Sequence, residues 1–258
     1  MKNALKNVKK RQQAIMTCME TAESIRVDDL AVLYGVSKAT IRRDLRLLED
    51  MGKLKRTHGG AHIQPVSAIS KEAPEITRIR LALAKVASSY INNHDIIFIN
   101  SSETAIFILN YLRDLTTTII TNNVSAIYLK KEDSTTLVLS GGEIRYPKEA
   151  MVGDIAINTI SKITGSICIM GCNGIHPVHG VTTESFHEAK VNNLFMENTN
   201  GLRIIVADYR KIGARYPFRS VETTQVDILI TDIFAPADIL NSLEKQGIEV
   251  IQVDPLSV

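Results

Sequence analysis

The sequence has few cysteines and no long apolar run, and each absence excludes a class of protein. Its 258 residues contain three cysteines, at positions 18, 168 and 172, too few and too irregularly spaced for a disulfide framework. Cys168-x-x-x-Cys172 lacks the second ligand pair of a zinc site. No run approaches the roughly 18 apolar residues that indicate a membrane span. The basic segment 1–11 has no apolar stretch behind it, so we expect no signal peptide. The few cysteines fit a reducing, cytoplasmic location. We also expect no metal and no cofactor.

Charge is distributed unevenly along the chain. Residues 1–63 carry 13 Lys and Arg against 7 Asp and Glu, a net charge of +6, whereas the remaining residues carry 17 against 21, a net charge of −4. A basic segment joined to a mildly acidic one indicates that the first meets a polyanion. A solvated charged surface would give the same count. Apolar residues make up 45% of the chain, which is enough for a sizeable buried core.

The first 64 residues have the outline of a winged helix-turn-helix domain. Apolar spacing predicts helices over about 6–22, 27–34 and 38–51. Gly35-Val36-Ser37 is the turn before the third helix, because glycine tolerates positive φ and Ser37 is a good N-cap. Two short extended pieces, 53–56 and 61–64, form a hairpin across His58-Gly59-Gly60.

The third helix separates aliphatic from basic residues. At 100° per residue Ile41, Leu45 and Leu48 fall on one side and Arg43 and Arg46 on the other. Arginine suits DNA because its planar fork bonds a guanine edge or clamps a phosphate. The alternative is a solvated face paired to neighbouring acids, which the accompanying turn and hairpin make less favoured. The predicted DNA-binding residues are Ser37, Lys38, Ala39, Thr40, Arg42, Arg43 and Arg46, with Lys55, Arg56, His58, Gly59 and Gly60 on the wing.

Residues 65–76 mix Pro, Ser and charges without period and are predicted to be a linker. From residue 77 to 258, short and nearly continuous apolar runs alternate with helical patterns. This texture indicates an α/β fold with a mainly parallel sheet covered on both faces. The predicted strands are 96–99, 117–121, 135–139, 166–170, 203–207, 227–231 and 249–253. The predicted helices are about 78–92, 104–113, 124–131, 151–161, 185–198 and 236–246.

Small polar loops follow several predicted strands, at the sheet edge where open α/β sheets bind ligands. Hydroxyls beside backbone N–H groups form a phosphate cradle, and asparagine or carboxylate side chains bond sugar hydroxyls. Each loop alone is an ordinary connector; several at one edge predict an effector site. The candidates are Asn100, Ser101, Ser102, Glu103, Thr104, Thr121, Asn122, Asn123, Gly141, Gly142, Glu143, Gly171, Asn173, Lys190 and Lys211.

Three motifs near the N-terminus resemble the DeoR family of bacterial sugar-metabolism repressors. They are Gly35-Val36-Ser37, Thr40-Ile41-Arg42-Arg43-Asp44-Leu45 and Arg56-Thr57-His58-Gly59-Gly60-Ala61. The resemblance continues through Ile119–Asn123, Leu139–Arg145, Ala207–Gly213 and Asp227–Asp232. It implies a ribose-5-phosphate isomerase-like sensor domain that binds a phosphorylated sugar and a partner in double-stranded operator DNA. A homo-oligomer, dimer or higher, is expected because such operators are two-fold or repeated.

Two segments depart from the family pattern. The first loop of the family usually runs Asp-x-Gly-(Ser/Thr)-Thr, whereas this chain has Asn100, Ser102 and Glu103 at the acid, glycine and next hydroxyl positions. A carboxylate at 103 repels a phosphate unless it points away. Family members carry Val-Lys-Arg after a Glu-Ala pair, where this chain reads Lys190-Val191-Asn192-Asn193.

Two other functions remain open at this point. An active sugar-phosphate isomerase would need a carboxylate base, but Asn173-Gly174-Ile175-His176 replaces the acidic segment of the resembling isomerases, and Pro177 and Gly180 indicate a surface turn beside His176 and His179. The altered loop at 100–104 also allows a degenerate sensor that serves only for oligomerisation. The chain would then bind DNA constitutively.

Overall fold

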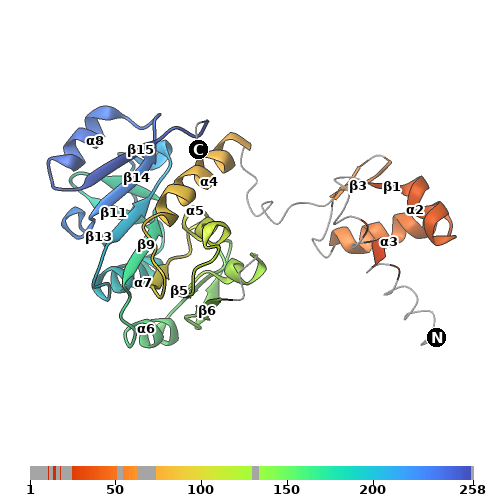
Figure 1. Cartoon of the computed structure of the whole chain (residues 1–258), viewed down its shortest axis with the longest axis horizontal. Coiled ribbons are helices and arrows are strands. Elements are labelled where there is room, and N and C mark those ends of the chain that lie inside the picture. The colour runs from red at the N-terminus through yellow and green to blue at the C-terminus, as the bar shows by residue number, and fades with distance from the viewer. Residues whose placement is uncertain are drawn as a thin grey trace. The chain divides into compact units, whose positions relative to one another are not determined.

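The computed structural model describes residues 25–50, 55–57, 59–62, 74–129 and 134–256, together with positions 11, 14, 15 and 18. The chain divides into two compact units, residues 1–71 and residues 72–258, whose elements are labelled in Figure 1. None of the helices in these described ranges is long and apolar enough to cross a membrane.

The first unit contains the two helices of a helix-turn-helix and a small antiparallel sheet. The helices are α2 (Val27–Tyr34) and α3 (Lys38–Asp50), as predicted. The strands β1 (Ile25–Arg26), β2 (Lys55–Arg56) and β3 (Gly60–His62) pair in the order β1-β3-β2. The hairpin is confirmed, with β3 beginning one residue before the predicted piece, whereas β1 was missed because two residues show no periodicity. The predicted helix 6–22 lies mostly outside the described residues; positions 11, 14, 15 and 18 are helical.

Both helix ends in the turn behave as the residue types predict. Arg26 precedes α2 without a side-chain cap, and the acidic Asp28 and Asp29 lie in the first helical turn, where they complement the helix dipole. Gly35 closes α2 in the left-handed conformation, at φ 61°. The Thr40 backbone N–H donates to Ser37 Oγ at 3.2 Å, which confirms Ser37 as the cap of α3.

The second unit is built on a seven-stranded sheet in the order β15-β14-β12-β9-β4-β5-β6, with every neighbouring pair parallel. All seven strands lie where continuous apolar runs predicted them. They are β4 (Ile96–Ile99), β5 (Thr117–Thr121), β6 (Thr135–Leu139), β9 (Ile167–Gly171), β12 (Arg203–Val206), β14 (Ile228–Asp232) and β15 (Glu249–Val253).

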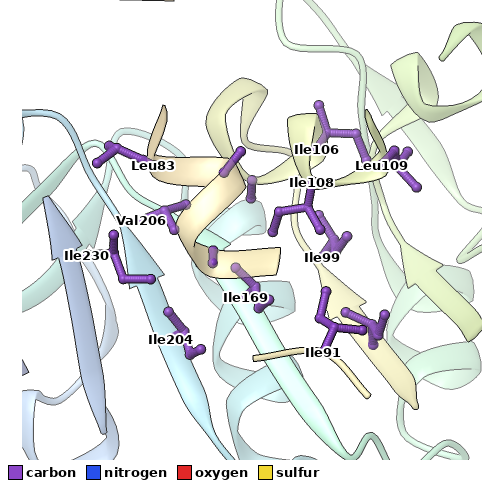
Figure 2. Packing of buried hydrophobic residues seen from close by; sticks show 14 of the residues in the cluster. Leu83, Ile91, Ile99, Ile106, Ile108, Leu109, Ile169, Ile204, Val206 and Ile230 are labelled. Atoms are coloured by element: carbon purple, nitrogen blue, oxygen red, sulfur yellow. The ribbon is translucent and has the colours of Figure 1, made fainter. Parts of the chain in front are cut away.

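The sheet is buried on both faces because successive side chains enter opposite cores. In β4, Ile97 and Ile99 belong to one apolar cluster and Phe98 to the other; in β12, Ile204 and Val206 alternate with Ile205 in the same way. Figure 2 shows Leu83 of the first helix of this unit, α4, among the strand residues Ile99, Ile169, Ile204, Val206 and Ile230 of the first cluster.

A different set of helices covers each face of the sheet. The first cluster contains α4 (Pro74–Ser88), α5 (Glu103–Ile106) and the 3-10 helix η2 (Phe107–Tyr111); the second contains residues of α6 (Asp154–Ile160), α7 (Phe186–Glu197) and α8 (Ala237–Glu244). Four predicted segments need correction. Helix α4 already begins at Pro74, inside the predicted linker, because proline is tolerated at the first helical position.

The other three corrections concern segments predicted as single helices. Half of 104–113 is the 3-10 helix η2, and the predicted helix 124–131 contains the 3-10 helix η3 (Val124–Tyr128). An apolar stripe over so few residues does not distinguish 3.0 from 3.6 residues per turn. The predicted helix 151–161 is strand β8 (Ala150–Val152) followed by α6. Gly153, at φ 88°, separates the two.

Two small antiparallel sheets, which the sequence pattern did not predict, complete the unit. Strand β7 (Glu143–Arg145) pairs with β8. Strands β10 (Gly174–His176), β11 (Gly180–Thr183) and β13 (Phe218–Val221) form a sheet in that order. The turn predicted at Pro177–Gly180 is confirmed as the β10–β11 connection.

Candidate DNA-binding surface and effector site

Helix α3 presents a basic face because its apolar face is anchored. Ile41 and Leu45 are fully buried and Leu48 nearly so, and they pack with Ile15, Val27, Leu30 and Ala61. Arg42, Arg43 and Arg46 are exposed. The predicted division of the helix into an anchoring side and an outward arginine side is confirmed.

Asp44 does not pair with the outward arginines. It is 2% exposed and accepts a hydrogen bond from Arg11 Nε at 2.6 Å. Lys38 forms an ion pair with Asp28 of α2, with its ammonium 2.9 Å from the carboxylate. This contact lowers the pKa of the Asp28 carboxyl. At the start of α3, Ser37 and Ala39 are exposed and Thr40 is half-buried.

The wing is described only in part. Gly59 is exposed, whereas Gly60 is buried, and a Cβ there would lie 2.1 Å from the Ile25 carbonyl oxygen of β1. Close strand pairing therefore requires glycine at 60. The side chains of Lys55 and Arg56, and the whole of His58, lie outside the described residues.

The effector candidates gather where parallel strands end. The chain leaves β4 for β5 and β6 on one side and later returns to β9, β12, β14 and β15 on the other. The topological switch point, where such sheets bind ligands, therefore lies between the loops after β4 and β9. The β5 and β6 loops, holding Thr121–Asn123 and Gly141–Gly142, end at the same edge.

Asn100 holds this switch point together. Its Nδ2 donates to the Gly171 carbonyl at 2.9 Å and to Asn192 Oδ1 at 3.1 Å. Its Oδ1 accepts from the N–H groups of Gly171, at 3.0 Å, and Ser102, at 3.3 Å. The buried amide thus joins β4, β9 and α7 and uses all its hydrogen-bonding groups inside the protein.

The rest of the first loop is arranged around Ser102. Its Oγ caps α5 by accepting from the backbone of Thr104 and Ala105, and a Cβ at Gly171 would lie 2.0 Å from that oxygen. Ser101 Oγ donates to Glu188 on α7 at 3.3 Å. Glu103 points to Arg80 of α4, with which it forms an ion pair. The pairing with Arg80 offsets the repulsion that a carboxylate at 103 would otherwise exert on a phosphate.

Lys211 is a cation without a counter-ion in direct contact. It lies in the 3-10 helix η4 (Tyr209–Lys211) after β12, and burial lowers its pKa, against the opposing effects of Cys172 and Asp208. Among the described residues its ammonium has no hydrogen-bond or ion-pair partner. Asp208 caps η4 and is fully buried. Burial alone would raise the Asp208 pKa, but Arg210, which bonds it, and Lys211 and Arg80 nearby lower it overall.

Several buried polar atoms at this edge lack a hydrogen-bond partner. Within the described ranges these include Thr104 Oγ1, Asn122 Oδ1 and, at the end of β14, Thr231 Oγ1. Asn122 is fully buried and donates to the Met151 carbonyl through Nδ2 at 3.0 Å. Buried polar atoms are normally paired, so each unpaired one calls for an explanation such as a ligand.

The sequence did not single out Lys148 or Glu188. Lys148 Nζ donates to Asn173 Oδ1 at 3.1 Å and to Glu188 at 3.2 Å. Asn173 also accepts from Thr183 at 3.0 Å. Lys148 follows no motif that would have marked it, and only the fold brings it to the β9 loop. The remaining edge residues, Thr121 and Asn123, bond within their own turn.

Two candidates lie elsewhere. The Lys190 ammonium lies over the Phe186 ring, 4.7 Å from its centroid, and lines a groove of about 380 Å³ between α7 and β13. One helical turn separates the two residues, so this cation–π contact is local. The Glu143 side chain is 68% exposed and pairs with Arg145. Among the described residues, no cluster of three His, Cys, Asp or Glu is arranged to hold a metal ion.

Comparisons with known proteins agree with both units. Residues 77–233 match the model of the DeoR C terminal sensor domain, and residues 11–65 match that of the DeoR-like helix-turn-helix domain. The chain is 30% identical to the HTH-type transcriptional regulator GlpR of Haloferax volcanii, over 93% of this chain and 96% of that protein. It is 25% identical to the glycerol-3-phosphate regulon repressor of Escherichia coli K12, over 93% and 97%.

Among solved structures, ribose 5-phosphate isomerase A from Methanocaldococcus jannaschii is similar, with a TM-score of 0.38 and 15% identity over 52% of this chain and 54% of that one. The two family matches together span both units of the chain. The chain therefore belongs to the DeoR family: it is a transcriptional regulator with a helix-turn-helix domain and a DeoR-type sensor domain, and not an enzyme.

Proposed function

We propose that this regulator is a repressor that binds operator DNA through the arginine face of α3 and is controlled by a phosphorylated sugar. The sugar binds at the carboxyl edge of the seven-stranded sheet. The observation that carries the proposal is Lys211, a partly buried cation with no ion-pair partner among the described residues, at the same sheet edge as the unpaired buried oxygens of Thr104 and Asn122.

The DNA half of the proposal rests on geometry and charge. Three exposed arginines lie on a helix whose opposite side is fixed in a core, so their positions are set before DNA arrives. The first 63 residues carry a net charge of +6, which favours association with a polyanion. Thr40 and the cap Ser37 lie at the end of the helix that usually approaches the DNA.

The effector half rests on complementary chemistry. A phosphate needs a cation and N–H or hydroxyl donors, which Lys211 and the first loop supply. Sugar hydroxyls both donate and accept, so they suit Thr104 Oγ1 and Asn122 Oδ1, which have no partner among the described residues. Asn100 and Ser102 position these loops. A repressor of the glycerol-3-phosphate regulon among the relatives supports a phosphorylated effector.

The DNA half is tested with Arg43→Ala and an operator selected from a random duplex pool. Loss of a base contact should weaken operator binding by about 1–3 kcal/mol and leave random DNA nearly unaffected. Arg113→Ala, which removes the same charge from an exposed position of the sensor unit, is the control and should change neither affinity. An equal loss on both DNAs would assign Arg43 to the phosphate backbone, and no loss would remove it from the interface.

The effector half is tested by thermal unfolding of the full chain with glycerol 3-phosphate, glucose 6-phosphate, fructose 6-phosphate and inorganic phosphate. A ligand present at about 100 times its Kd stabilises its protein by roughly 2.7 kcal/mol, which is easily seen as a higher melting temperature. Lys211→Ala should abolish the rise, and the exposed Lys162→Ala should retain it. A sensor that responds to no phosphosugar would favour the constitutive DNA binder instead.

A further inference from the structure

Arg80 is a buried arginine that contacts two of the candidate effector loops at once. It is 6% exposed, and arginine is seldom buried unless its charge is compensated. Its guanidinium pairs with Glu103, in the loop after β4. On another side its Nε lies 4.0 Å from Asp208 Oδ2, in the loop after β12.

These two carboxylates belong to the parts of the loops that face the proposed ligand. Glu103 lies between Ser102, which caps α5, and Thr104, whose hydroxyl is unpaired among the described residues. Asp208 caps the turn that carries Lys211. Movement of either loop would therefore change the surroundings of Arg80.

The two partners differ in how easily they can leave. The Glu103 side chain is 43% exposed, whereas that of Asp208 is fully buried and also bonds Arg210. An anion bound near Lys211 adds negative charge to this cluster and competes for the guanidinium. Because Glu103 can move into water at little cost, the Arg80–Glu103 contact is the one that yields.

Arg80 also lies in the first helix of the sensor unit. Helix α4 begins at Pro74 and continues the segment that connects to the DNA-binding unit. Ile79 and Leu83 are buried in the first apolar cluster and fix one side of the helix on the sheet, and Figure 2 shows Leu83 in this position. Arg80 ties another side to the loops. A helix held by an apolar contact and a breakable ion pair has two arrangements that a ligand can favour differently.

We propose that Arg80 is a positioning residue through which effector binding in the loops after β4 and β12 is passed to α4 and onward to the DNA-binding unit. This coupling rests on the proposed function, because it uses the same effector site. It assigns a role to a residue outside both sets of candidate binding residues. The ion pair with Glu103 keeps the free protein competent for DNA, and the bound anion releases it.

The first test needs no effector. Operator affinity of the full chain is measured by fluorescence anisotropy for the wild type, Arg80→Met, Glu103→Gln and Arg78→Met. Methionine keeps an apolar stem without the charge, and Arg78 is an exposed arginine on the same helix. Arg80→Met and Glu103→Gln should weaken operator binding by about 5-fold, the lower end of usual allosteric couplings, and Arg80→Lys should restore part of the loss.

Arg78→Met should bind as the wild type does. Equal affinities for Arg80→Met and Arg78→Met would overturn the proposal. Glu103→Gln keeps it falsifiable if Arg80→Met folds poorly, because Glu103 is partly exposed and its amide substitute keeps its shape. Circular dichroism and melting temperature establish that the variants compared are folded.

The second test separates coupling from ligand binding. For any of the four phosphate probes that binds the wild type, Arg80→Met should bind it within about 3-fold of the wild-type Kd, while the ligand's effect on operator affinity falls from about 10-fold to less than 2-fold. A full response in Arg80→Met would overturn the coupling. Absence of binding to every probe in the wild type would count against the phosphosugar effector, and the effector-free test would still decide Arg80.

Discussion

The two units of this regulator use positive charge in opposite ways. In the first unit Arg42, Arg43 and Arg46 stand exposed on α3, where water surrounds them. In the sensor unit the cations Arg80 and Lys211 are withdrawn from water, beside a fully buried Asp208. Exposed charges suit a long polyanion, which is met by many weak and salt-sensitive contacts. Desolvated charges suit a small anion that must be held by few groups.

This difference extends to what holds each site in place. The face of α3 depends on one small cluster of aliphatic residues, seven of them buried among the described residues. The effector loops depend instead on buried polar side chains that join strands far apart in the sequence, with Asn100 at the centre. Damage to a core should therefore disable the first unit, and damage to a hydrogen-bond network should disable the second.

The largest effect is expected from Leu45→Ala. This side chain is fully buried in the small core, so its truncation should cost the first unit about 2–5 kcal/mol, a large part of the stability of so small a unit. Operator binding should be lost while the sensor unit unfolds as before, as followed by urea titration with hydrogen exchange in each unit. Leu33→Ala, at a position 62% exposed, is the matched control. A common shift of both units would contradict independent unfolding of the two units.

Asn100→Ala should lower the stability of the sensor unit. It leaves both the N–H and the carbonyl of Gly171 without their side-chain partner, and an unsatisfied buried group costs about 1–3 kcal/mol. The urea midpoint of the sensor should fall and the operator affinity of the first unit should not. The partly buried Asn193, whose amide bonds Glu197 in its own helix, provides the control Asn193→Ala. An unchanged midpoint in Asn100→Ala would show that the switch point is not held by this amide.

Local sequence patterns predicted the framework because its physics is local. Continuous apolar runs marked all seven strands of the parallel sheet, and the helical spacing of Ile41, Leu45 and Leu48 marked the buried side of α3. Loops that follow parallel strands necessarily meet at one edge. The location of the candidate site therefore followed once the strands were known.

Side-chain partners could not be predicted in this way. Asn100 bonds residues 71 and 92 positions away, and no spacing rule reaches that far. Glu103 reads as an obstacle to a phosphate until the fold supplies Arg80, 23 positions earlier. The strands β10, β11 and β13 were not predicted because none of them is a continuous apolar run: their sequences are Gly-Ile-His, Gly-Val-Thr-Thr and Phe-Arg-Ser-Val.

The smallest effect, and one opposite in sign to the others, is expected from Lys211→Met. Burial lowers the Lys211 pKa, so the unfolded chain holds this proton more tightly than the folded one. Burial of the protonated lysine therefore costs stability. The wild type should therefore gain stability as pH rises from the lowered folded pKa toward the ordinary value of 10.5.

Lys211→Met removes that cost and should stabilise the ligand-free sensor by about 1 kcal/mol at pH 7, as functional-site substitutions often do. It should also flatten the alkaline rise, measured as the urea midpoint against pH, while Lys162→Met leaves both unchanged. The same variant should lose its thermal response to phosphosugars. If Lys211→Met were instead destabilising at neutral pH, the charge would be serving the fold of the sensor, and the contrast between exposed charges for DNA and withdrawn charges for a small anion would fail at this residue.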